Sequence, residues 1–186
     1  PGGGSASAFT GAAGAALVAM VGRLTVGKKK YAAVEPQMWS MIDQAENLRK
    51  SLTEAVERDA AAFDDLMTAM RLPKETEEQQ EKRNAAIRTA TLQAARIPLE
   101  VARMSVEVMR LAVTAATLGN LNAISDGATG GALAKAALTG AGYNVRINLL
   151  DYAEQPDARE LLDSLAALEK DAASIEVEIR TALTER

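Results

Sequence analysis

Proline and glycine divide this chain into five long segments, and their spacing limits the fold more than any other feature. Within each segment apolar residues recur every three or four positions, as on one face of a helix, and no stretch shows the alternation typical of a strand. The sequence therefore predicts an all-α multihelical bundle. Its long helices are expected over about residues 6–25, 36–70, 77–118 and 126–151 and from residue 156 onward, with a kink at Pro98.

Short polar side chains mark the starts of several of these helices. Thr76 and Gln79 form the pattern of a capping box, Ser5 is a suitable N-cap for the first helix, and Ser125 or Asp126 suits the fourth. Gly119 is suited to end the third helix. A chain of 186 residues without a low-complexity linker fits one domain, so residues 1–186 are expected to form a single all-helical unit.

The core of such a bundle must be built from small residues. Apolar residues make up 48% of the chain and aromatic residues only 3%, with Ala, Leu, Val and Met supplying most of the apolar share. Ala-rich helices can approach each other closely, but the first and fourth helices would bury little side-chain volume within a lone domain. We therefore expect a homodimer or a larger oligomer.

The chain has no Cys and no His, which removes thiolate chemistry, disulfides and the usual zinc ligands. We expect no metal site and no tightly bound cofactor, and any general acid or base must be Asp, Glu, Lys or Tyr. The net charge of −4 disfavours nucleic acid as a partner. The apolar stretch over residues 1–22 is too rich in Gly and Ala to be a convincing membrane span. The expected location is therefore the cytoplasm, with no membrane partner.

Asp59 interrupts the apolar face of the second expected helix. It fills the gap between Val56 and Phe63, so the steps along that face are three or four residues throughout. A carboxylate in such a position points toward the core or a cleft and is a candidate proton donor or acceptor. A structural salt bridge, or a cap for another helix, would place an Asp there as well.

The chain opens with a glycine-rich segment that contains Gly2, Gly3 and Gly4, followed by Ser5. Free backbone N–H groups at the start of a helix attract anions, so this segment is a candidate binding loop. It lacks the Lys-Ser/Thr pair of a P-loop. A flexible terminus is the alternative interpretation.

A short basic run, Lys28, Lys29 and Lys30, stands out in an acidic protein. Three adjacent cations could hold a multiply charged anionic tail. The alternative is a solvated C-terminal end of a helix, where Lys side chains interact favourably with the helix dipole.

Asn144, Asn148 and Asp151 follow one another at steps of four and three, so they share one face of the fourth helix. A polar stripe beside small residues suits a groove that hydrogen-bonds a flat heterocycle, and it equally suits a polar seam against a partner. Asn120 and Asp126 can be turn and cap residues.

Six stretches of this sequence together resemble the cyclodeaminase/cyclohydrolase family, which includes the C-terminal domain of formiminotransferase-cyclodeaminase and stand-alone bacterial proteins. No single stretch is decisive, but all six occur in the family's order. They are PGGGS at 1–5, LTVGKKKY at 24–31, DAAAF at 59–63, MRLPK at 70–74, GN at 119–120 with SD at 125–126, and NVRINL at 144–149. Family members usually have a short helix before the glycine-rich loop, so we expect that helix to be missing from this sequence.

The resemblance implies an all-helical homodimer that binds folate in a cleft near the subunit interface. It implies cyclisation of 5-formiminotetrahydrofolate to 5,10-methenyltetrahydrofolate with release of ammonia, and it makes Asp59 the expected catalytic proton carrier. The residues expected to bind folate are Gly2, Gly3, Gly4, Ser5, Lys28, Lys29, Lys30, Asn120, Asp126, Asn144 and Asn148.

Three other functions are compatible with the same residues. A methenyltetrahydrofolate cyclohydrolase would add water to the methenyl bridge in the same pocket. A non-enzymatic helical bundle would hold Asp59 in a buried ion pair with no cleft beside it. A folate-binding module without catalysis is the third. Neighbouring genes for histidine degradation would favour the cyclodeaminase.

Overall fold

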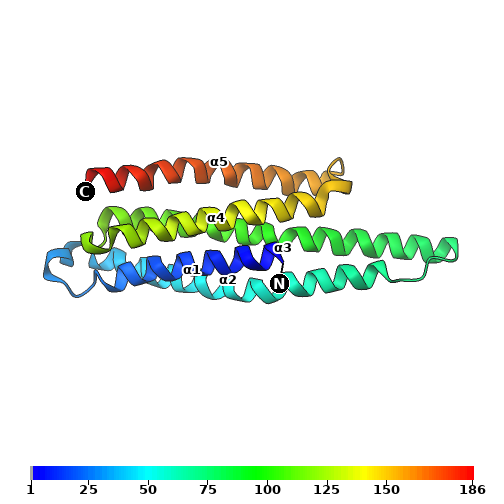
Figure 1. Ribbon diagram of the computed structural model, residues 1–186, viewed down its shortest axis with the longest axis horizontal. Coiled ribbons are helices and arrows are strands. Elements are labelled where there is room, and N and C mark those ends of the chain that lie inside the picture. Colours follow the sequence, from blue (N-terminus) through cyan, green and yellow to red (C-terminus); the bar gives the residue numbers. More distant parts are fainter. Residues whose placement is uncertain (1) are drawn as a thin grey trace.

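Five long α-helices account for most of residues 2–186, which are the residues that the computed structural model describes (Figure 1). The all-α prediction is confirmed, since no strand occurs in this part of the chain. Pro1, which opens the glycine-rich segment, lies outside the described residues. The helices are α1 (Gly3–Arg23), α2 (Glu35–Met70), α3 (Glu77–Leu118), α4 (Ile124–Leu149) and α5 (Pro156–Glu185), with short 3-10 helices η1 (Lys29–Val34), η2 (Leu121–Ala123) and η3 (Leu150–Tyr152) between them.

Some of the predicted helix ends are confirmed and others are wrong. Thr76 and Gln79 form the predicted capping box, and Gly119 is the C-cap of α3. Ser5 is not the N-cap of α1, because the helix already begins at Gly3 and Ser5 reaches across to α2 instead.

The predicted cap of α4 is also wrong. Neither Ser125 nor Asp126 caps this helix, since α4 begins at Ile124. The chain enters it directly from η2, and the Ile124 N–H is already bonded to the Leu121 carbonyl.

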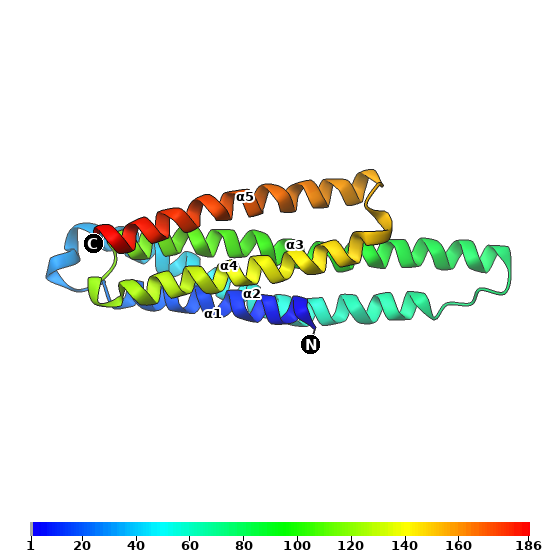
Figure 2. The same cartoon turned by 45° about the horizontal axis from the view of Figure 1, so that its top comes forward.

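α1 packs against α2, α3 and α4, while α5 covers α3 and α4 on the other side (Figures 1 and 2). The small residues of α1 permit close contacts: a Cβ atom at Gly14 would lie 2.7 Å from the carbonyl oxygen of Gly130 on α4. Leu52, Val18 and Met109 are fully buried in the common core. The molecule is therefore held together by closely spaced helices rather than by large aromatic side chains.

α1 is long and apolar enough to cross a membrane by length and composition, with a mean hydropathy of 1.4 over its best window. In this structure 61% of that window is buried among the other helices. Such burial is typical of the central helix of a bundle.

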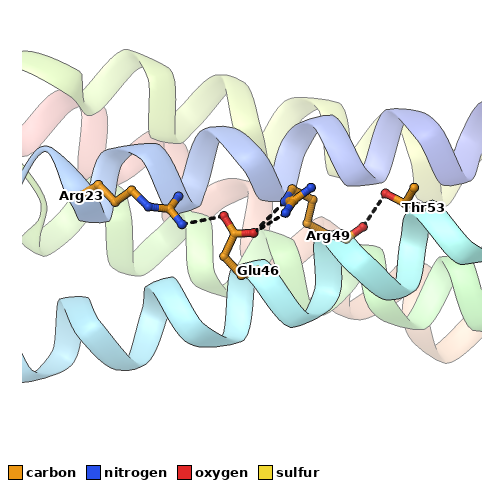
Figure 3. A network of polar contacts seen from close by, with 4 residues as sticks. All are labelled: Arg23, Glu46, Arg49 and Thr53. Atoms are coloured by element: carbon orange, nitrogen blue, oxygen red, sulfur yellow. Dashed lines mark hydrogen bonds and ion pairs between the residues drawn. The ribbon is translucent and has the colours of Figure 1, made fainter.

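Ion pairs join the helices at the surface. Glu46 on α2 accepts hydrogen bonds from Arg23 on α1, at 2.8 Å, and from Arg49 on its own helix (Figure 3). The bond from Arg23, followed by that from Arg49, lowers the pKa of Glu46. Arg146 on α4 binds both carboxylate oxygens of Glu169 on α5, and this contact raises the pKa of Arg146. Exposed pairs of this kind contribute about 0–1 kcal/mol each, so core packing dominates the stability.

The C-terminal part of α2 and the N-terminal part of α3 extend past the start of α1 as a hairpin (Figure 1). Where α1 begins, the hairpin is packed by a small cluster of Ala62, Ala94 and Ile97. The different lengths of α1 and α2 leave a step in the bundle, and the N-terminus of α1 lies at this step.

Pro98 lies inside α3, and the helix continues through it. Because proline has no N–H, the carbonyl of Ala94, four residues earlier, loses its partner within the helix. The side-chain amide of Asn148 on α4 donates to this carbonyl at 2.8 Å. A helix defect in α3 therefore fixes the position of a polar side chain on α4.

This arrangement predicts an energetic coupling between Pro98 and Asn148. In the wild-type background, Asn148→Ala leaves the Ala94 carbonyl unpaired and should reduce the free energy of unfolding by about 1 kcal/mol or more. In a Pro98→Ala background the restored amide can pair with that carbonyl, so the same change should cost clearly less. Urea denaturation of the four proteins measures the coupling, and equal costs in both backgrounds would contradict it.

Candidate active site at the start of α1

A cleft of about 610 Å³ opens at the step between the N-terminus of α1 and the α2–α3 hairpin. This volume is within the usual range of small-molecule sites, about 300–1,000 Å³. α1, α2, α3 and α4 all contribute to its walls. The lining residues are Gly2, Gly3, Gly4, Asp59, Ala60, Phe63, Asp64, Leu66, Ala94, Asn144 and Asn148.

Asp59 is half-buried in this cleft, on the face of α2 that meets α1. Its Oδ2 atom accepts a hydrogen bond of 2.8 Å from the hydroxyl of Ser5. Among residues 2–186, no Lys or Arg lines the cleft. The buried ion pair that would favour a purely structural Asp59 is therefore not found in the described part of this site.

Gly4 allows α1 to approach this carboxylate. A Cβ atom at Gly4 would lie 2.2 Å from Oδ1 of Asp59 and 2.7 Å from Oδ2, so no other residue fits without displacing Asp59. Gly3 faces the opposite wall, where a Cβ atom would lie 2.9 Å from Nδ2 of Asn144. The glycines thus serve close packing of α1 between Asp59 and Asn144.

The first turn of α1 also presents free backbone donors at the cleft. The Ala6 N–H is the first amide of the helix that bonds within it, to the Gly2 carbonyl at 3.0 Å. The preceding N–H groups, of Gly3, Gly4 and Ser5, have no carbonyl partner within the helix, as at any helix N-terminus. They form the donor side of the site.

Asn144 and Asn148 line the opposite wall and are fixed in orientation. The Asn144 side chain donates to the carbonyl of Gly140 at 2.8 Å, and the Asn148 side chain donates to that of Ala94 at 2.8 Å. Since the NH₂ group of each amide faces a carbonyl, each Oδ1 atom remains available as an acceptor. The structure confirms that both side chains share one face of α4, whereas Asp151 lies beyond it in η3 and does not line the cleft.

The basic run lies at the other end of α1. Lys28, Lys29 and Lys30 are exposed and follow the C-terminus of this 21-residue helix. At about 1.5 Å per residue, the helix separates them from the glycine-rich end by about 30 Å. A single chain therefore does not bring these lysines to the cleft.

Asn120 and Asp126 also lie at that end. Asn120 lies outside the cleft of its own chain. The residue is only 6% exposed, and its polar groups hold the connection between helices. Its amide donates to the Leu24 carbonyl at 2.9 Å, and its backbone N–H donates to Thr25 at 2.8 Å. Asp126, in the first turn of α4, lies outside the cleft.

Tyr31 belongs to the same distant turn. Its phenol oxygen accepts a hydrogen bond of 3.0 Å from the Leu121 N–H. This bond is the main cause that lowers the pKa of Tyr31. These contacts stabilise the turn and are remote from the cleft.

Two notable residues of the site are not among those predicted from the sequence. Asp64 lines the cleft five positions after Asp59, and Phe63 is 58% exposed at its edge. Both lie on the side of α2 next to Asp59, so the position of Asp59 on the helix was the signal that could have identified them. No cluster of Asp and Glu suited to a metal ion occurs within residues 2–186.

Known proteins match most of this chain in sequence. The family model described as formiminotransferase-cyclodeaminase matches residues 1–167. A methenyltetrahydrofolate cyclohydrolase of Methylorubrum extorquens is 41% identical over 175 residues, which cover 94% of this chain and 84% of that protein. A formimidoyltransferase-cyclodeaminase of Sus scrofa is 33% identical over 172 residues, which cover 92% of this chain but only 32% of that longer protein.

A solved structure agrees with these matches. The formiminotetrahydrofolate cyclodeaminase of Thermotoga maritima superimposes with a TM-score of 0.89 at 27% identity, covering 100% of this chain and 88% of that one. The resemblance drawn from six short stretches thus extends to the fold and to most of the sequence. The chain belongs to the formiminotransferase-cyclodeaminase family of folate one-carbon enzymes.

Proposed function

We propose that this protein acts on the one-carbon bridge between N5 and N10 of tetrahydrofolate and that its main reaction is hydrolysis of 5,10-methenyltetrahydrofolate. The observation that carries the proposal is the cleft in which Asp59 faces the start of α1. The choice of hydrolysis rests on the 41% identity to a cyclohydrolase that is matched over 84% of its length. This identity favours hydrolysis over cyclodeamination, although the family resemblance by itself implies cyclodeamination.

The polarity of the cleft supports such a substrate. Its side-chain wall consists of acceptors, namely the carboxylates of Asp59 and Asp64 and the Oδ1 atoms of Asn144 and Asn148. A reduced pterin presents several N–H donors, and the methenyl bridge carries a delocalised positive charge. Acceptors and negative charge complement both features.

Asp59 can serve both halves of the hydrolysis. As a carboxylate it takes a proton from the water whose oxygen bonds to the bridge carbon. It then returns that proton to N5 as the C–N5 bond breaks, while the hydroxyl proton leaves and the formyl group remains on N10. One water is consumed and one proton is released. The carbon stays at the oxidation level of formate, so the reaction needs no redox cofactor.

Cyclodeamination is the second candidate, and the fold shared with the Thermotoga maritima cyclodeaminase favours it. N10 of 5-formiminotetrahydrofolate bonds to the carbon of the protonated formimino group, –CH=NH₂⁺, which becomes an amino group, and N10 loses its own proton to Asp59. The same proton then converts the amino group into ammonia, which leaves. Both reactions pass through a tetrahedral carbon between N5 and N10, so one carboxylic acid suffices for either.

We also propose a homodimer in which one subunit completes the site of the other. α1 and α4 lie side by side against α3, and their outward sides carry exposed apolar residues. Phe9 on α1 is 70% exposed, and Tyr143 and Ile147 on α4 are 66% and 65% exposed. Leu150, which follows α4 in η3, is 67% exposed. If two copies pack through this face with their α1 helices antiparallel, the basic run of one copy lies near the glycine-rich end of the other. The chain is expected to act in the cytoplasm.

The proposed reaction is tested by supplying the two folates separately. Hydrolysis predicts that the purified protein accelerates the loss of 5,10-methenyltetrahydrofolate and releases little ammonia from 5-formiminotetrahydrofolate. Methenyl absorbance and an ammonia assay follow the two reactions, with the spontaneous rate subtracted. Faster ammonia release than hydrolysis would make the protein a cyclodeaminase, and no acceleration of either would contradict the proposal.

Asp59→Asn keeps the size of the side chain but cannot cycle a proton. General acid–base catalysis contributes about 10²–10⁴-fold, so kcat should fall by about that factor while thermal stability and folate binding change little. Asp43→Asn, an exposed change on the same helix, is the matched control. A well-folded Asp59→Asn protein with kcat within a few-fold of wild type would rule out the proton-carrier role.

The triple change of Lys28, Lys29 and Lys30 to Ala tests whether the basic run holds the glutamate tail. We expect it to remove most of the preference for polyglutamylated over monoglutamylated folate, and added salt should weaken that preference in the wild type. KM values for the two folates provide the measurement. An unchanged preference would show that the three lysines do not hold the tail and are only solvated residues at the end of a helix.

The dimer is tested at the exposed face of α1 and α4. A stable interface should bury upward of about 1,000 Å² in total, so Phe9→Glu with Ile147→Glu should shift the wild-type dimer toward monomer in sedimentation. Val177→Glu on α5 is the matched control, since Val177 is also 63% exposed. A wild-type protein that is monomeric at micromolar concentration would contradict the proposed dimer.

A further inference from the structure

Ser5 occupies an unusual position for a hydroxyl group. It lies in the first turn of α1, is only 1% exposed and reaches two acceptors on α2. One is Oδ2 of Asp59 at 2.8 Å, and the other is the carbonyl oxygen of Val56 at 3.3 Å. These two acceptors are three residues apart on one helix, so the hydroxyl lies between a titratable group and a backbone oxygen that never changes its charge.

A serine hydroxyl carries one proton and also accepts hydrogen bonds. When Asp59 is a carboxylate, the hydroxyl can donate to Oδ2. When Asp59 is protonated, its own O–H can donate to the Ser5 oxygen, and the Ser5 proton can turn to the Val56 carbonyl. Both arrangements use the same positions of the heavy atoms, and only the hydroxyl hydrogen rotates.

We propose that Ser5 is a positioning residue that holds Asp59 in one orientation through both of its protonation states. This role rests on the proposed function of Asp59 as a proton carrier and reassigns Ser5 from folate binding. A carboxylic acid that takes and returns a proton needs a partner that can accept as well as donate. A backbone N–H could only donate, and a lysine would hold the carboxylate in its charged form.

The surroundings make this role specific to Ser5. Gly4 brings α1 so close to Asp59 that a Cβ atom at position 4 would lie 2.2 Å from Oδ1 of the carboxylate. Of the other described residues that line the cleft, only Asp64 has an ionisable side chain, and the lining contributed by α1, α3 and α4 is neutral. Ser5, on α1, hydrogen-bonds Asp59 on α2. This contact is the one through which α1 can control the orientation of the carboxylate.

The first test needs no substrate. In the full-length protein, the side-chain carboxyl ¹³C signal of Asp59, assigned by its loss in Asp59→Asn, is followed as a function of pH. Ser5→Ala removes the hydrogen bond of both forms, and the bond to the charged carboxylate is the stronger of the two. The midpoint of the titration should therefore move to higher pH by about one unit. Ser7→Ala is the matched control, because Ser7 is also buried on α1 but donates to the Gly3 carbonyl at 2.7 Å.

The second test uses turnover. Ser5→Ala should lower kcat about tenfold with little change in KM and should move the limb of the pH–rate profile that Asp59 controls to higher pH. In an Asp59→Asn background the same change should have little further effect. An unmoved ¹³C titration in a folded Ser5→Ala protein would overturn the proposal. Inactivity of the wild type on both folates would instead overturn the proposed function, which the titration does not measure.

Discussion

The structure depends on how closely α1 approaches its neighbours. At Gly14 a Cβ atom would lie 2.7 Å from the backbone of α4, and at Gly4 it would lie 2.2 Å from the carboxylate of Asp59. The core contains few aromatic residues, so it is stabilised largely by van der Waals contact between helix backbones. Small residues on α1 let the neighbouring helices approach closely, which brings more backbone atoms within contact distance. The contacts that bring α1 into the core also bring its first turn to Asp59, so stability and the geometry of the cleft have the same origin.

The polar groups of the cleft are fixed by helices rather than by loops. Asp59, Asn144 and Asn148 project from α2 and α4, and each is hydrogen-bonded to a group that the fold holds in place. The Ala94 carbonyl that binds Asn148 is free only because Pro98 removes an N–H from α3. Side chains held in this way need little reorganisation when a ligand binds, which is the physical condition for efficient proton transfer.

The sequence predicted the helices well because periodicity and helix breakers are local signals. Asp59 was identifiable for the same reason, since it interrupts an apolar face. The partners of Ser5 and Asn120 were not, because their contacts span 54 and 96 residues and depend on which helices pack together. The lysine run and the glycine-rich segment were both expected to bind folate, but they lie at opposite ends of the 21-residue helix α1. Asp64 lacked any interruption of a pattern that would have marked it.

Hydrolysis and cyclodeamination make opposite demands on water in the same cleft. A cyclodeaminase has to keep water from the methenyl carbon that it forms, whereas a cyclohydrolase has to hold one water against that carbon. The acceptors around this cleft, Asp59 with the fixed Oδ1 atoms of Asn144 and Asn148, are the groups that could bind and orient such a water. As the proposed proton carrier, Asp59 could serve either reaction, and the choice between them would depend on whether the bound folate leaves room for a water beside these acceptors.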